Sequence, residues 1–82
     1  MDVFFNLSDG NVFCMEVGYW DTVLEIKEKV EKHKNIPFYK QKLTLNGQVL
    51  KDTDTPWNVK ILHHSRIHVE IVDSPTSSTG SN

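Results

Sequence analysis

The stretch that decides the fold is IPFYKQKLTLNGQVLKD, residues 36–52. Pro37 has no amide hydrogen to donate, so a helix arriving from upstream must end before it. Residues 42–50 then predict two short strands, because Asn46-Gly47 between them is the strongest short signal for a tight hairpin turn. The stretch therefore predicts that a preceding helix ends before Pro37 and that a β-hairpin follows at residues 42–50.

The first seventeen residues predict another hairpin. Apolar side chains recur at every second position, which is the period of a half-buried strand. Asp9-Gly10 interrupts the pattern and supplies the positive φ angles that a tight turn needs. The apolar positions are Met1, Val3, Phe5, Leu7, Phe13, Met15 and Val17. Residues 66–72 alternate in the same way and predict a last strand.

A helix is predicted between the two hairpins. Asp21 or Thr22 offers a side-chain oxygen that can cap the free amides of a first helical turn. The apolar side chains that follow at helical spacing are Val23, Ile26 and Val30. We expect the charged residues of this segment, Lys27 among them, to cover the opposite side and face solvent.

The predicted order is two strands, a helix, two strands, a helical turn entered at Thr55-Pro56, and a final strand. A mixed sheet packed on one face of the main helix is the economical architecture for this order, an α+β roll. The expected core consists of Val3, Phe5, Phe13, Met15, Val17, Val23, Ile26, Val30, Leu43, Leu50, Ile61, Ile67 and Val69.

Composition narrows the function classes. The formal net charge of −2 gives no strong attraction to nucleic acid. No apolar stretch is long enough to span a membrane, and no basic segment leads into an apolar run as in a secretory signal. We therefore expect a protein of the cytosol or nucleus with no cofactor. Residues 73–82 are small and mostly polar, which predicts a flexible linker after a folded domain of residues 1–72.

The folded part resembles the ubiquitin family over its whole length. The most specific matches are Ile36, Pro37, Gln41, Leu43, Gly47, Leu50 and Asp52. Ras-binding and PB1-like domains, which are other β-grasp types, lack this spaced series. The resemblance implies the ubiquitin-like β-grasp form of the α+β roll. It also implies a domain that binds other proteins and is not an enzyme.

One departure from the family concerns conjugation, which requires a C-terminal Gly-Gly. Residues 71–76 read IVDSPT at the corresponding place, and the family's two arginine positions are Val72 and Ser74. We therefore do not expect a conjugable modifier.

A second departure concerns recognition, since the family's partner-binding face centres on an exposed leucine, isoleucine and valine. The resemblance places this altered face at Ser8, Lys42, Thr44, Gly47, Gln48, His68 and Glu70. The three apolar positions are Ser8, Thr44 and Glu70. Burying each apolar side chain contributes roughly 1.5–3 kcal/mol, so we expect standard ubiquitin receptors to bind weakly.

The first hairpin offers an alternative surface. Alternation points Phe4, Val12 and Cys14 outward, away from the helix, where a contiguous apolar patch often marks a contact site. Two interpretations stay open. In the first, the domain is a monomeric, non-covalent interaction module of a larger protein, linking it to the ubiquitin–proteasome system or another complex. In the second, the patch packs on the rest of its own parent protein.

Three further groups of residues favour a structural role. Trp57 is expected to pair with Tyr19 or Trp20 and to hold two loops together, which we favour over a peptide slot. Alternation is expected to send His63 and His64 to different sides, so no metal site is predicted. Cys14 has no basic neighbour to activate it, so we expect an inert thiol.

Overall fold

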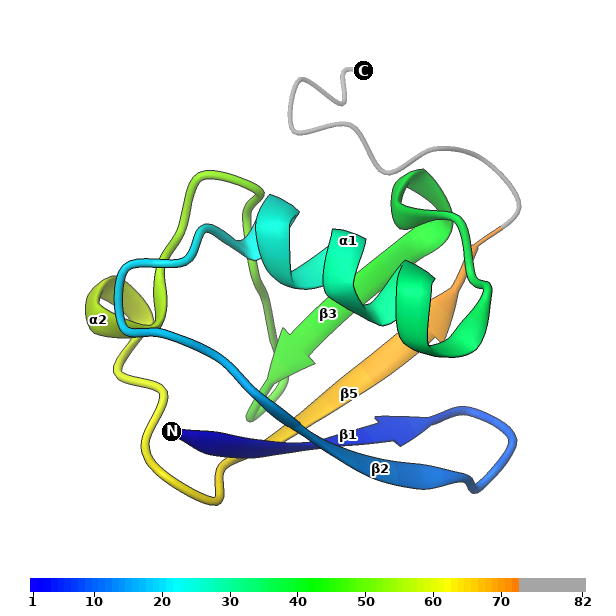
Figure 1. Ribbon diagram of the computed structural model, residues 1–82, viewed down its shortest axis with the longest axis horizontal. Coiled ribbons are helices and arrows are strands. Elements are labelled where there is room, and N and C mark those ends of the chain that lie inside the picture. Colours follow the sequence, from blue (N-terminus) through cyan, green and yellow to red (C-terminus); the bar gives the residue numbers. More distant parts are fainter. Residues whose placement is uncertain (73–82) are drawn as a thin grey trace.

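The computed structural model describes residues 1–72 of the chain. These residues form one mixed sheet with a single long helix lying across one of its faces (Figure 1). The predicted linker, residues 73–82 with Ser74, lies outside the described residues. The predicted α+β roll of the ubiquitin-like β-grasp type is confirmed.

The sheet contains five strands in the spatial order β2-β1-β5-β3-β4. The strands are β1 (Asp2–Leu7), β2 (Val12–Glu16), β3 (Gln41–Leu45), β4 (Gln48–Val49) and β5 (Arg66–Ile71). The central pair β1 and β5 is parallel, while the other three pairings are antiparallel. Both hairpins predicted from the sequence are therefore present, and the last strand joins them into one sheet.

The main helix α1 runs from Val23 to Lys34 and begins and ends where the sequence predicts. Thr22 is its N-cap: the Thr22 hydroxyl accepts from the Glu25 amide at 3.2 Å, and the Glu25 carboxylate accepts from the Thr22 amide at 2.9 Å. This reciprocal capping box satisfies two amides that the helix itself leaves free. Asn35 ends the helix with a left-handed backbone, φ 59°.

Two short helical turns complete the fold. They are η1 (Phe38–Lys40), directly after Pro37, and α2 (Pro56–Val59). Thr55 caps α2 as predicted, accepting a hydrogen bond from the Asn58 amide at 3.2 Å. Neither turn, nor α1, has the length and apolar character that crossing a bilayer requires, within residues 1–72.

The core lies between α1 and the sheet and agrees closely with the predicted list. Every predicted core residue is buried except Met15, which is half-buried and packs against the core. Leu7 and Ile36 are additional members.

The expectation that Lys27 faces solvent is wrong. Its side chain is buried, and its ammonium group lies 2.8 Å from the Asp52 carboxylate in the loop after β4. Gln41 is also buried, and its amide donates to the backbone oxygens of Lys27 and Ile36 at 2.9 and 3.0 Å. A buried lysine needs a charged partner, and the partner comes from a segment 25 residues away that helical periodicity does not reveal.

Candidate functional site

The sheet face opposite α1 carries the residues that the family resemblance assigns to recognition. In the register of β3 against β5, Lys42 lies opposite Glu70, and Thr44 lies opposite His68. The Lys42 ammonium group is 3.7 Å from the Glu70 carboxylate. Where the family has isoleucine, this chain has the hydroxyl-bearing Thr44. Where the family has valine, it has Glu70, which forms an exposed ion pair.

The other residues assigned to this face border it and are exposed. Ser8 follows β1, and its hydroxyl donates to the backbone oxygen of Val69 at 3.4 Å. Gly47 has a φ of 83° in the turn between β3 and β4, which only glycine adopts readily. Gln48 begins β4. The structure therefore brings the predicted residues together, but as a polar surface.

The hairpin patch of Phe4, Val12 and Cys14 lies on the same sheet face. Phe4 pairs across the strands with Cys14, and Val12 pairs with Asn6. Val12 and Cys14 are exposed. Phe4 is half-buried and not fully exposed, because the Arg66 guanidinium lies over its ring, 5.6 Å from the ring centre.

The two predicted surfaces are also neighbours. Asn6 lies opposite Val12 on one side and beside His68 of β5 on the other. A partner that covers the outer sheet face therefore touches both sets, which sequence reasoning treated as separate.

The largest exposed apolar side chains lie elsewhere, around α2. Trp20 is 72% exposed, Leu62 70%, Trp57 63% and Tyr19 53%. We call these four residues the α2 surface. Trp20 and Trp57 pair as predicted, with ring centres 5.6 Å apart and tilted by 39°. The pair joins α2 to the loop before α1, yet most of both rings stays open to solvent.

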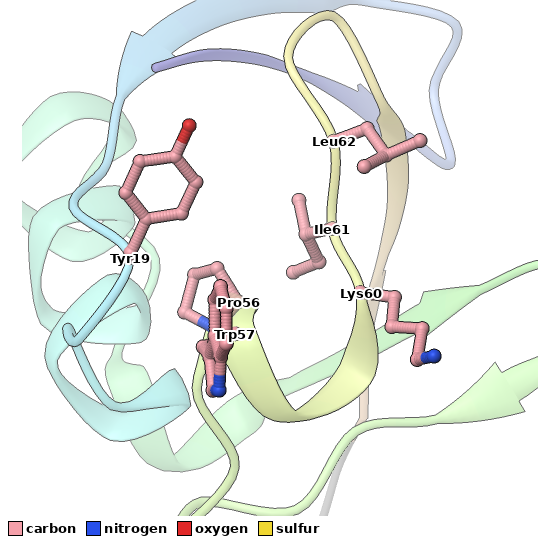
Figure 2. A pocket seen from close by; sticks show the side chains of 6 residues that line it. All are labelled: Tyr19, Pro56, Trp57, Lys60, Ile61 and Leu62. Atoms are coloured by element: carbon pink, nitrogen blue, oxygen red, sulfur yellow. The ribbon is translucent and has the colours of Figure 1, made fainter.

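A hollow of about 480 Å³ opens within this surface. Figure 2 shows Tyr19 and Leu62 on opposite sides of the hollow, with Ile61 between them. Ile61 and Pro56 are buried and form its apolar floor, and Lys60 contributes the cationic group of the lining. Leu62 was missed by the sequence analysis, because a lone leucine in a loop carries no periodic signal.

Backbone hydrogen bonds position the residues of the hollow. The Trp57 amide donates to the Tyr19 oxygen at 3.2 Å, which joins α2 to the loop before α1. Lys60 ends α2 with a left-handed φ of 59°, and the Ile61 amide donates back to the Pro56 oxygen at 2.9 Å. The hollow is therefore built into the loop connections.

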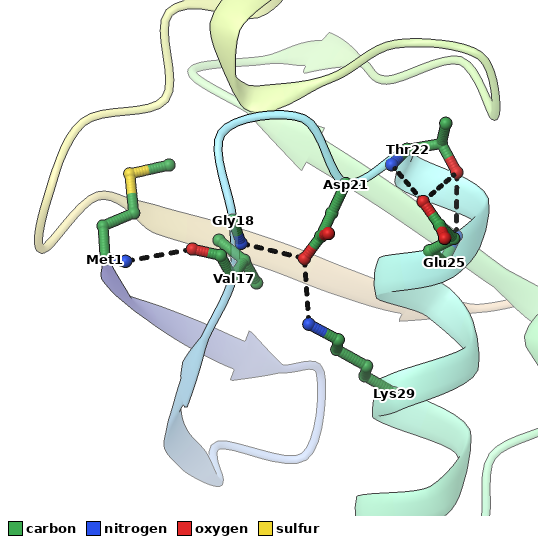
Figure 3. A network of polar contacts seen from close by, with 7 residues as sticks. All are labelled: Met1, Val17, Gly18, Asp21, Thr22, Glu25 and Lys29. Carbon is green, nitrogen blue, oxygen red and sulfur yellow. Dashed lines mark hydrogen bonds and ion pairs between the residues drawn. The ribbon is translucent and has the colours of Figure 1, made fainter.

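Asp21 fixes the loop that carries Tyr19 and Trp20. Its carboxylate accepts from the Gly18 amide at 2.8 Å and lies 2.9 Å from the Lys29 ammonium group (Figure 3). The hydrogen bond from Gly18, and then the one from Lys29, lower the pKa of Asp21 below its ordinary value of 3.8.

The expectation that His63 and His64 point to different sides is wrong. Their rings lie 3.8 Å apart, because His64 takes a left-handed φ of 69° and strand alternation does not apply in this turn. The Asp2 carboxylate lies beside both imidazoles.

Comparison with known proteins agrees with this architecture. The model of the ubiquitin family matches residues 3–72, which is most of the chain. The chain belongs to the ubiquitin family. The ubiquitin domain-containing protein 7SL RNA2 of Arabidopsis thaliana is 42% identical over 52 residues, covering 63% of this chain. The same match covers 20% of that relative, so this chain spans a small part of its length. Domains of this family are generally protein-interaction modules and generally lack enzymatic activity.

Proposed function

We propose that this ubiquitin-like domain is a non-covalent protein-interaction module of a larger protein. It links that protein to the ubiquitin–proteasome system or to another complex of the cytosol or nucleus. It is neither an enzyme nor a conjugable modifier. The observation that carries the proposal is the α2 surface, where four large apolar side chains stay more than half exposed and three of them, Tyr19, Trp57 and Leu62, line a hollow.

Tryptophan and tyrosine are the side chains most enriched among residues that dominate binding energy, especially where they surround a pocket that a partner can fill. At this site they are already positioned, since the pairing of Trp20 with Trp57 limits the rotamers that a partner would have to order. The buried floor of Pro56 and Ile61 keeps the hollow apolar. A partner that inserts an apolar side chain here gains burial without a large ordering cost.

The outer sheet face supports the usual ubiquitin contacts poorly. A receptor groove built for apolar side chains would have to desolvate Glu70 and separate it from Lys42. We therefore assign the main contact to the α2 surface and a secondary one to the outer sheet face.

An NMR titration tests the proposal. The isotope-labelled chain is titrated with a panel of ubiquitin-receptor domains and with purified proteasome. We expect the largest shifts at the indole N–H groups of Trp20 and Trp57, with smaller ones at residues 42–48 and 68–70. Saturable shifts at micromolar affinity confined to residues 42–48 and 68–70 would refute the assignment to the α2 surface.

Paired variants localise the contact. Trp57→Ala should lower the affinity for the partner detected in the titration by about tenfold or more, as removal of a central aromatic residue commonly does. Tyr39→Ala is the matched control, because Tyr39 is another exposed aromatic residue but belongs to η1. Equal losses in both variants would contradict a contact centred on α2.

A second candidate function rests on the hairpin patch. Val12 and Cys14 are exposed beside Phe4, which suits a domain that packs on its own parent protein. This alternative predicts that the isolated chain self-associates through the patch and that Val12→Lys restores a monomer, as measured by light scattering. A chain that is monomeric at high concentration favours recruitment of an outside partner.

A further inference from the structure

A cluster of three potential metal ligands lies at the N-terminal ends of β1 and β5. The Asp2 carboxylate and the imidazoles of His63 and His64 each offer a ligand atom, and these three atoms lie within 4.8 Å of one another. All three side chains are exposed. They come from opposite ends of the described chain, so the fold itself assembles them.

Backbone hydrogen bonds hold the elements of the cluster in place. The His64 amide donates to the Asp2 backbone oxygen at 2.7 Å, which ties the turn of residues 62–65 to β1. The turn is closed by the Ser65 amide, which donates to the Leu62 oxygen at 2.9 Å. It is closed again by the Leu62 amide, which donates to the Ser65 hydroxyl at 2.8 Å. Because the backbone is fixed on both sides, only side-chain rotation remains to complete a coordination shell.

We propose that Asp2, His63 and His64 form a surface site for a divalent transition-metal ion, with Zn²⁺ as the type case. Imidazole nitrogen with one carboxylate suits Zn²⁺ and Cu²⁺, whereas Ca²⁺ and Mg²⁺ require mostly oxygen ligands. Three protein ligands leave a fourth position for water or for a side chain of a partner.

The distances suit such an ion after a small adjustment. Zinc lies about 2.0–2.2 Å from nitrogen and oxygen ligands, so tetrahedral ligand atoms are about 3.3 Å apart. The ligand atoms of this cluster must therefore approach by at most about 1.5 Å, which rotation of exposed side chains allows. The Asp2 carboxylate also offsets part of the charge that the ion brings.

Binding has a specific structural consequence at His63. Its Nδ1 accepts a hydrogen bond from the Asp2 amide at 3.1 Å. In a neutral imidazole only one ring nitrogen has a free lone pair. If Nδ1 binds the ion, it can no longer accept from the Asp2 amide. If Nε2 binds the ion, the proton moves to Nδ1, which then cannot accept either. Metal binding therefore replaces this hydrogen bond, and the Asp2 amide resonance reports it.

The test is titration of the chain with Zn²⁺ alone in a non-chelating buffer, followed by calorimetry and by NMR. We expect saturable binding of one equivalent, with the largest shifts at the Asp2 amide and at the ring protons of His63 and His64. Absence of saturable binding up to millimolar Zn²⁺ overturns the proposal.

Matched variants separate this site from the other histidines. His63→Gln and His64→Asn should each weaken binding by about tenfold or more. Asparagine is chosen because it tolerates the left-handed backbone at position 64. His33→Gln and His68→Gln are the controls, since His33 stacks on Phe13 and His68 lies within β5. If a control variant loses as much affinity as His64→Asn, the proposed ligand set is wrong.

Asp2→Asn tests the carboxylate and should also weaken Zn²⁺ binding. Thermal unfolding of each variant without metal checks that the fold is kept. A variant that melts like the unaltered chain and still binds Zn²⁺ at full affinity removes that residue from the site.

Discussion

The outer sheet face and the α2 surface differ in how they relate to the family. The first occupies the place where ubiquitin receptors are expected to bind, but it presents Ser8, Thr44 and an exposed ion pair of Lys42 with Glu70. The second presents four exposed apolar side chains, three of which line a hollow. The comparison shows that one β-grasp core can support either kind of surface, because exposed positions contribute little to folding.

The largest expected effect is a gain in receptor affinity when the apolar side chains of the outer sheet face are restored. The triple variant Ser8→Leu, Thr44→Ile and Glu70→Val should strengthen binding to ubiquitin-receptor domains by up to about a hundredfold to a thousandfold. Calorimetry against such a domain measures it. The single variant Thr44→Ile is the graded control. An unchanged affinity in the triple variant would show that the polar substitutions are not what weakens this face.

The next effect concerns the floor beneath the α2 surface. Ile61 is 2% exposed, so Ile61→Ala removes buried methyl groups and should lower the free energy of unfolding by about 2–5 kcal/mol. Urea unfolding measures this change. Leu62→Ala is the control. Because the Leu62 side chain is exposed, its removal should lower the free energy of unfolding far less. Similar costs in both variants would mean that the two side chains are equally packed.

A smaller effect separates binding from loop packing at Trp57. If the aromatic pair serves mainly to present a surface, Trp57→Ala loses a pair contact of about 0.5–1.5 kcal/mol and the burial of a minor part of the ring, so it lowers the free energy of unfolding by less than Ile61→Ala does. Urea unfolding of Trp57→Ala beside Trp20→Ala measures both halves of the pair. A loss as large as that of Ile61→Ala would favour loop packing as the main role.

The smallest effect is at Asp21, which fixes the loop of the α2 surface. Because folding lowers its pKa, the ionised carboxylate stabilises the fold above its ordinary value of 3.8, and this contribution is lost as the pH falls below that value. Asp21→Asn should therefore lower the free energy of unfolding at neutral pH by less than about 1 kcal/mol, since solvent screens the pair.

The pH dependence gives the control for that variant. The difference in unfolding free energy between the unaltered chain and Asp21→Asn should shrink as the pH is lowered past 3.8. Urea unfolding at a series of pH values measures it. A difference that grows on acidification would contradict the assignment.

The sequence by itself determined the elements and the core. The cap at Thr22, the stop at Pro37 and the turn at Asn46-Gly47 are local signals, and the structure places each where it was predicted. Strand and helix periodicity likewise identified nearly all of the buried apolar residues. These signals are readable because capping, turn formation and alternation depend on neighbours within a few positions.

Only the tertiary structure decided which distant residues meet. The burial of Lys27 depends on Asp52, and the ligand cluster depends on β1 lying beside the turn before β5. The α2 surface likewise needs the loop before α1 to lie against α2. Each contact joins segments far apart in the chain, and hydrophobic periodicity carries no information about which polar or aromatic side chains such packing brings together.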